Sequence, residues 1–100
     1  MNPKVQLDRE ALAEFCRKWR IRELSLFGSA LRDDFGPESD LDFLVSFEPG
    51  APLDLFDLAD MKEDLEAHCG RPVDLVEKDA LRNPWRKREI LRTHEVIYAA

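Results

Sequence analysis

Three aspartates and a Gly-Ser pair are the residues of this chain whose types and spacing suit chemistry on phosphate groups. Gly28-Ser29 is followed, after ten residues, by Asp40-x-Asp42, and a third acid, Asp74, lies in the apolar segment Pro-Val-Asp-Leu-Val. Glycine lets a backbone approach a phosphate closely, and a serine hydroxyl beside a helix N-terminus offers hydrogen-bond donors. Clustered carboxylates repel one another unless a cation lies between them. The pattern therefore predicts a cation site next to a phosphate-binding turn.

Magnesium is the cation that suits this set of carboxylates. Mg²⁺ prefers octahedral oxygen coordination and usually combines a few carboxylates with substrate phosphates. Two such ions about 3.5–4 Å apart can stabilise both the attacking and the leaving oxygens of an in-line displacement. We therefore expect Asp40, Asp42 and Asp74 to bind Mg²⁺, with Mn²⁺ as the alternative, and Arg32 to add a positive charge over the phosphates.

The strands expected around these residues would bring them to one end of a sheet. We predict a first strand over Ile21–Phe27, a second over Leu41–Phe47 and a third over Pro72–Val76, and Val96–Tyr98 suits a last short strand. If the first two strands are antiparallel neighbours, the Gly-Ser turn lies beside the acid pair. A helix between the second and third strands suits a parallel crossover, which places Asp74 at the same edge.

Three helices are predicted between and beside these strands. Asp8 can cap the first, while Asp54 can cap the second and Gly70 can stop it. Asn83-Pro84 starts the third, which should run to about Arg92. The expected fold is therefore α/β, of the α+β kind, with one mixed sheet of three or four strands packed with helices.

In order and spacing, these motifs resemble those of the DNA polymerase beta-like nucleotidyltransferases. The shortness of the chain makes it similar to the minimal nucleotidyltransferases, or MNT proteins, and the resemblance covers nearly the whole chain. It implies the polymerase beta-like fold and assigns Asp40 and Asp42 to the metal-binding pair. It also implies that Asp74 helps to hold the catalytic metal and draws the proton from the attacking hydroxyl.

The same resemblance assigns Gly28 and Ser29 to the nucleotide-phosphate motif, and Arg32 and Ser39 complete the residues expected to bind the nucleotide. The implied reaction transfers a nucleoside monophosphate from a nucleoside triphosphate to a hydroxyl and releases pyrophosphate. Among MNT proteins a recurrent arrangement is the antitoxin of a toxin–antitoxin pair whose partner is a helical HEPN ribonuclease. The resemblance therefore implies adenylylation of a tyrosine on a HEPN toxin, with ATP as the substrate.

The composition suits one small soluble domain over residues 1–100. Of 100 residues, 44% are hydrophobic and 36% are charged, which is enough for a modest core without disulfides. The formal net charge of −6 argues against direct DNA binding, which needs phosphate-neutralising cations. The sequence has no signal peptide and no membrane-length apolar run, so we expect a cytoplasmic protein without membrane contact.

Several other residues have plainer interpretations. Cys16 and Cys69 form no Cys-x-x-Cys pair and are expected to be buried free thiols, and Trp19 belongs to the apolar stripe of the first helix. His68 and His94 lack metal-ligand spacing. For the basic run around the third helix, a solvated surface and docking of an acidic partner or of nucleotide phosphates are both open. This run consists of Arg82, Arg86, Lys87, Arg88 and Arg92.

Two further hypotheses compete with the partner-modifying enzyme. A non-catalytic antitoxin or binding module would neutralise its partner by occlusion, with a vestigial or regulatory metal site. A stand-alone transferase would act on a small molecule instead. Larger relatives carry an added domain for the acceptor, for which this chain has no room, so the acceptor must be met by a partner or by self-association as a homo-oligomer. The sequence does not identify the acceptor or the preferred base.

Overall fold

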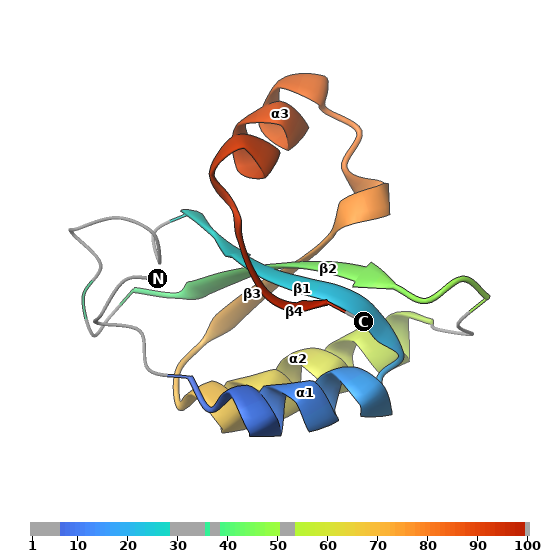
Figure 1. The fold of residues 1–100 in the computed structure, drawn as a ribbon, viewed down its shortest axis with the longest axis vertical. Helices are drawn as coiled ribbons and strands as arrows, with labels where there is room; N and C mark the ends of the chain where they lie inside the picture. Colours follow the sequence, from blue (N-terminus) through green and yellow to red (C-terminus); the bar gives the residue numbers. More distant parts are fainter. Residues whose placement is uncertain (1–6, 29–35, 37–38, 51–53, 100) are drawn as a thin grey trace.

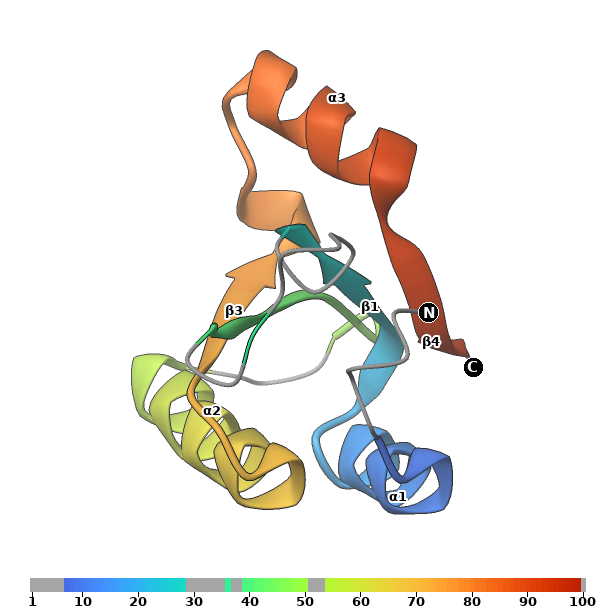
Figure 2. The same cartoon turned by 90° about the vertical axis from the view of Figure 1, so that its left-hand side faces the viewer.

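Two helices lie on one face of a four-stranded sheet and a third lies on the other face (Figure 1, Figure 2). The computed structural model describes residues 7–28, 36, 39–50 and 54–99, apart from the side chain at position 55. The elements in chain order are α1 (Arg9–Lys18), β1 (Ile21–Phe27), β2 (Leu41–Phe47), α2 (Leu55–Cys69), β3 (Val73–Glu77), the 3-10 turn η2 (Lys78–Ala80), α3 (Pro84–Thr93) and β4 (Glu95–Ala99). The predicted α+β fold with one mixed sheet is confirmed.

The sheet has the order β3-β2-β1-β4, with β1 antiparallel to both of its neighbours and β2 parallel to β3. The first two strands have the predicted bounds. The third begins at Val73 rather than Pro72, because proline has no N–H to donate to the ladder. The Pro72 carbonyl still accepts a hydrogen bond from Leu41 N at 3.1 Å, which joins the starts of β2 and β3.

Each helix begins at the cap that the sequence predicts. The Asp8 side chain accepts hydrogen bonds from two backbone N–H groups of α1, and Asp54 forms a capping box with Asp57 at the start of α2. Asn83 caps α3, with proline in the first helical position. Gly70 ends α2 in the left-handed conformation, at φ 68°. None of the described helices is both long and apolar enough to cross a membrane.

The alternation of β2 divides the hydrophobic core into two parts. Leu41, Phe43 and Val45 face α1 and α2, where they join the larger cluster of buried side chains. Leu44 faces the opposite way and packs with Phe27 of β1 and Ile90 of α3. The remaining members of the larger cluster are Leu12, Phe15, Cys16, Ile21, Leu24, Leu26, Met61, Leu65, Val73 and Ile97. The face under α3 therefore has a much smaller apolar core.

Both cysteines are free thiols, as predicted, Cys16 fully buried and Cys69 half-buried. Burial raises the pKa of Cys16 to about 12 and the pKa of Cys69 to about 11. A thiol is nucleophilic only as its thiolate, so neither cysteine is chemically activated here.

A polar contact on Asp64 joins α1 to α2. Its Oδ2 atom accepts hydrogen bonds from Trp19 Nε1 at 2.9 Å and from Lys18 Nζ at 3.2 Å, and His68 Nε2 lies 3.7 Å from Oδ1. The hydrogen bond from Trp19 is the main cause that lowers the pKa of the Asp64 carboxyl. Trp19 thus packs as part of the core, as predicted, and its polar end is satisfied by the second helix.

We predict that Asp64→Ala lowers the free energy of unfolding by about 1–2 kcal/mol at pH 7, because Trp19 Nε1 then loses its acceptor. The pKa of Asp64 is lower in the folded state than in the unfolded state. Its ionisation therefore stabilises the fold fully above the unfolded pKa of about 3.9, and this contribution is lost as the pH falls through the lower folded pKa. Urea unfolding at neutral and acidic pH measures both effects.

The matched control is Asp60→Ala, which removes an exposed carboxylate from the same helix. Asp60→Ala should leave the unfolding free energy within about 0.5 kcal/mol of the wild type. Equal losses in the two variants, or a loss for Asp64→Ala that does not shrink in acid, would contradict the proposed role of the Asp64 contact.

Candidate active site

Two of the three predicted acids are direct neighbours across the parallel strands. Asp42 of β2 and Asp74 of β3 are register partners, and adjacent strands lie roughly 4.8 Å apart. Both alternate with residues of the larger core, so their side chains belong to the face of the sheet that α3 covers. Asp42 is half-buried and Asp74 is exposed. The sheet therefore places these two carboxylates side by side on the same face.

The turn after β1 lies directly against Asp42. Phe27 is the register partner of Asp42, and Gly28 follows with φ at 69°, a conformation that favours glycine. A Cβ atom built on Gly28 would overlap Asp42 Oδ2. The predicted approach of the Gly-Ser turn to the acid pair is thus present at Gly28, where a side chain would have to displace the carboxylate of Asp42. Ser29 and Arg32 lie outside the described residues.

Asp40 lies immediately before β2, at the same end of the sheet as Asp42, and is exposed. Alternation along the chain places residues 40 and 42 on one face. Among the described residues, no three His, Cys, Asp or Glu side chains are gathered closely enough to hold a metal ion.

Ser39 has a structural position in the turn before the acid pair. Its hydroxyl accepts a hydrogen bond from Gly36 N at 3.2 Å, and its own N–H donates to Gly36 O at 3.1 Å. Arg71 Nη1 donates to Gly36 O and Ser39 O, both at 3.2 Å. The sequence reasoning missed Arg71, whose one available signal was a cation three residues before Asp74. Arg71 ties the segment before Asp40 to the segment before Asp74.

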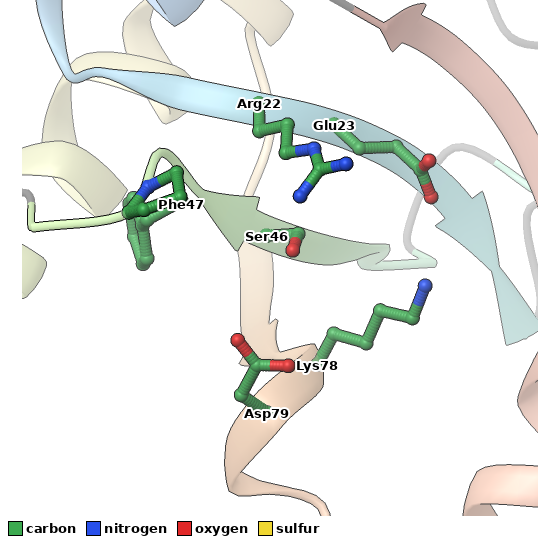
Figure 3. Close-up of a pocket in the computed structure, with 7 residues that line it drawn as sticks. Arg22, Glu23, Ser46, Phe47, Lys78 and Asp79 are labelled. Carbon is green, nitrogen blue, oxygen red and sulfur yellow. The ribbon is translucent and has the colours of Figure 1, made fainter.

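The described residues form clefts both beside Asp74 and at the opposite end of the sheet. One of about 300 Å³ reaches Asp74 along β3 and α2, where Lys62 also lines it. Another, of about 480 Å³, lies where β2 ends, with Ser46 some four residues and roughly 13 Å beyond Asp42 (Figure 3). Its lining residues are Arg22, Glu23, Ser46, Phe47, Pro49, Lys78 and Asp79. The second cleft is therefore separate from the acid pair.

Residues 8–97 match the family described as the nucleotidyltransferase domain. A protein adenylyltransferase named MntA from Thermococcus cleftensis is 39% identical over 85 residues, which are 85% of this chain and 81% of the relative. A chain of Methanocaldococcus jannaschii, also assigned as a protein adenylyltransferase, is 39% identical over 82 residues, 81% of this chain and 79% of its own length.

Solved structures share the fold. One assigned as a minimal nucleotidyltransferase has a TM-score of 0.71 at 36% identity, covering 87% of this chain and 86% of that chain. A toxin–antitoxin structure with AMP-PNP has a TM-score of 0.75 at 18% identity, covering 94% and 75%. An MNT antitoxin in complex with the tri-AMPylated HEPN toxin of Shewanella oneidensis has a TM-score of 0.64 at 16% identity, covering 92% and 70%.

The sequence matches span most of this chain and most of each relative, and the minimal nucleotidyltransferase structure has the same overall fold. The chain belongs to the nucleotidyltransferase domain family, among its minimal nucleotidyltransferases, and is an enzyme of that class.

Proposed function

We propose that this chain transfers AMP from ATP to a tyrosine hydroxyl of a HEPN-family partner and thereby acts as its antitoxin. The observation that carries the proposal is the register pair Asp42 and Asp74, with Gly28 closed against Asp42. The named relatives support protein adenylylation, and the fold neighbours with AMP-PNP and with an AMPylated toxin support the nucleotide and the kind of partner. A tyrosine is the acceptor that the family resemblance implies.

In this reaction the acceptor hydroxyl attacks the α-phosphorus of ATP. The new O–P bond forms as the bond to the bridging oxygen breaks, and pyrophosphate leaves. The Asp74 carboxylate is exposed and accepts the hydroxyl proton, while the backbone at Gly28 approaches the phosphates. Ser29 and Arg32 are proposed to bind the same phosphates, with Ser39 shaping the turn beside them.

The donor set at this edge fits Mg²⁺, with Mn²⁺ as the alternative. Asp40, Asp42 and Asp74 offer only carboxylate oxygens, and the absence of a side chain at Gly28 lets the backbone lie against Asp42. When bound, the metal neutralises charge that develops on the phosphates. Because the three carboxylates do not form a preassembled cage in the described residues, we propose that substrate phosphates complete the coordination.

We therefore predict that Mg²⁺ alone binds weakly and that ATP binds more tightly with Mg²⁺ than without it. ATP supplies phosphate oxygens as metal ligands, and Mg²⁺ supplies the positive charge that the phosphates need. The binding free energies of ATP and Mg²⁺ are therefore coupled. Calorimetric titration of ATP in the presence of Mg²⁺ and in the presence of a chelator measures this coupling. Identical ATP affinity under the two conditions would contradict the proposed carboxylate site.

Asp42→Asn should reduce AMP transfer by roughly a hundredfold or more, with a melting temperature equal to or above that of the wild type. The amide is close to isosteric, so Leu41 and Phe43 need not repack, whereas one carboxylate of a like-charged cluster is removed. Transfer of labelled AMP and thermal unfolding are the two measurements. The control Asp60→Asn removes an exposed charge from the first half of α2 and should keep full transfer.

The same variant separates catalysis from occlusion. If AMP transfer neutralises the toxin partner, Asp42→Asn should still bind the partner. It should neither modify the partner nor protect cells from it. Full protection by a variant that transfers no AMP would instead establish the non-catalytic antitoxin. Full transfer by Asp42→Asn would remove this residue from the reacting centre.

Gly28→Ala should lose both stability and transfer, because its Cβ would displace Asp42 Oδ2. Gly50→Ala is the matched control: Gly50 has φ at 78°, and a Cβ there meets nothing within 4 Å. Both variants bear the backbone cost of about 1 kcal/mol for an L side chain in the left-handed region. Chemical unfolding and AMP transfer should show that only Gly28→Ala loses activity. Equal transfer by both variants would contradict the close approach.

A further inference from the structure

The outer side of α3 carries a basic surface with an exposed tryptophan. Within α3, Ile90 is the buried residue, and it packs on Phe27 and Leu44 on the face of the sheet that also carries Asp42. Figure 1 and Figure 2 show the helix standing on the opposite side of the sheet from α1 and α2. The α3 basic surface is defined by the exposed side chains Trp85, Arg88 and Arg92, with the exposed Arg86 next to Trp85 in the first turn.

These side chains are arranged for contact with another molecule. Trp85, Arg88 and Arg92 are spaced i, i+3 and i+7, which places them on one side of the helix. The Trp85 residue is 75% exposed, although indole rings are among the most effective contact groups in protein interfaces. Arg92 pairs with Glu89 at 2.6 Å, whereas Arg86 and Arg88 form no ion pair among the described residues.

The charge of this surface is opposite to that of the whole chain. Segment 82–92 contains five cations and one acid, while the chain has a net charge of −6. The first turns of α1 and α2 contain an acid, but the first turn of α3 contains none. Its N-terminal dipole therefore adds to the charge of Arg86 instead of being offset. A complementary partner must be acidic where it meets α3.

We propose that the α3 basic surface docks an acidic segment of the protein that accepts AMP. This inference rests on the proposed function. Ile90 packs in one cluster with Phe27, which is the register partner of Asp42. The helix α3 therefore packs on β1, the strand next to the one that carries Asp42. The helix has ten residues and is about 15 Å long, and the cluster of Ile90 with Phe27 and Leu44 places it over the face of the sheet that carries Asp42 and Asp74. Docking there limits which hydroxyl can reach Asp74.

A protein fits this surface better than a nucleic acid. A polyanion would meet repulsion from a chain with net charge −6 outside the short basic segment, whereas an acidic peptide segment meets only the local patch. Exposed tryptophan and arginine side chains are also the types that carry most binding energy in protein interfaces.

The test uses fluorescence anisotropy with a short labelled peptide that contains one tyrosine flanked by aspartates and glutamates. Its matched probe has asparagine and glutamine in place of the acids. We expect the full chain to bind the acidic peptide more tightly than the neutral one. Arg88→Glu with Arg92→Glu should weaken that binding by roughly tenfold, and Trp85→Ala by about fivefold.

The matched control is Arg9→Glu with Arg17→Glu, two exposed arginines of α1 that give the same change in net charge. This control should bind the acidic peptide within about twofold of the wild type. An equal loss in the control, or equal affinity for the two peptides, would overturn the proposal. Tighter binding of a single-stranded RNA through the same α3 residues would replace it with a nucleic-acid site.

The same samples with ATP and Mg²⁺ distinguish this inference from the proposed function. Asp42→Asn should bind the peptide like the wild type and transfer no AMP to it. Docking that depends on α3 without AMP transfer by the wild type would reject the proposed function alone. Transfer that is insensitive to the α3 substitutions would reject the docking surface alone.

Discussion

The parallel pairing of β2 with β3 is the constraint on which the candidate site depends. It makes Asp42 and Asp74 register partners, and the alternation of each strand then decides which face their side chains occupy. A slip of one residue would move Asp74 to the face of α1 and α2 and would expose Val73 and Leu75, which pack there now. Apolar burial on one face therefore fixes the position of the charged residue on the other. The pairing register of β2 with β3 that buries the apolar core residues also determines where Asp42 and Asp74 lie.

Helices cover the two faces of the sheet to different extents. The less covered face suits a site that binds phosphate groups. The face toward α1 and α2 buries a continuous cluster, while the buried apolar cluster on the α3 face consists of Phe27, Leu44 and Ile90 among the described residues. Charged groups are costly to bury without partners, so carboxylates belong where water and substrate can reach them. Asp42 is half-buried at the border of the small cluster and Asp74 is exposed beside it. The thin cover of α3 thus leaves room at the edge where the acids lie.

The features that the sequence predicted are those with local physical causes. Alternation and Gly28 set the bounds of β1 and β2, and caps and the left-handed Gly70 set the helix ends, so these agree with the structure. The contact of Arg71 with the turn at Ser39 was not predictable, since it joins residues over thirty positions apart. The link through Asp64 depends in the same way on how two helices pack. Spacing identified the acids and the end of the sheet that they share, but it did not predict that Asp42 and Asp74 are register partners on β2 and β3.

On the proposed function, occlusion and modification can both contribute to neutralising the partner. Asp74 is exposed on the edge strand β3, so a protein acceptor must lie over that edge of the sheet when the bond forms. Binding of this kind already covers part of the partner, and transfer of AMP then adds a bulky anion to it. Binding energy depends on contact area and complementary charge, whereas transfer depends on the carboxylates at the sheet edge. Because different residues carry the two effects, neutralisation by contact and neutralisation by chemistry can be changed independently in this fold.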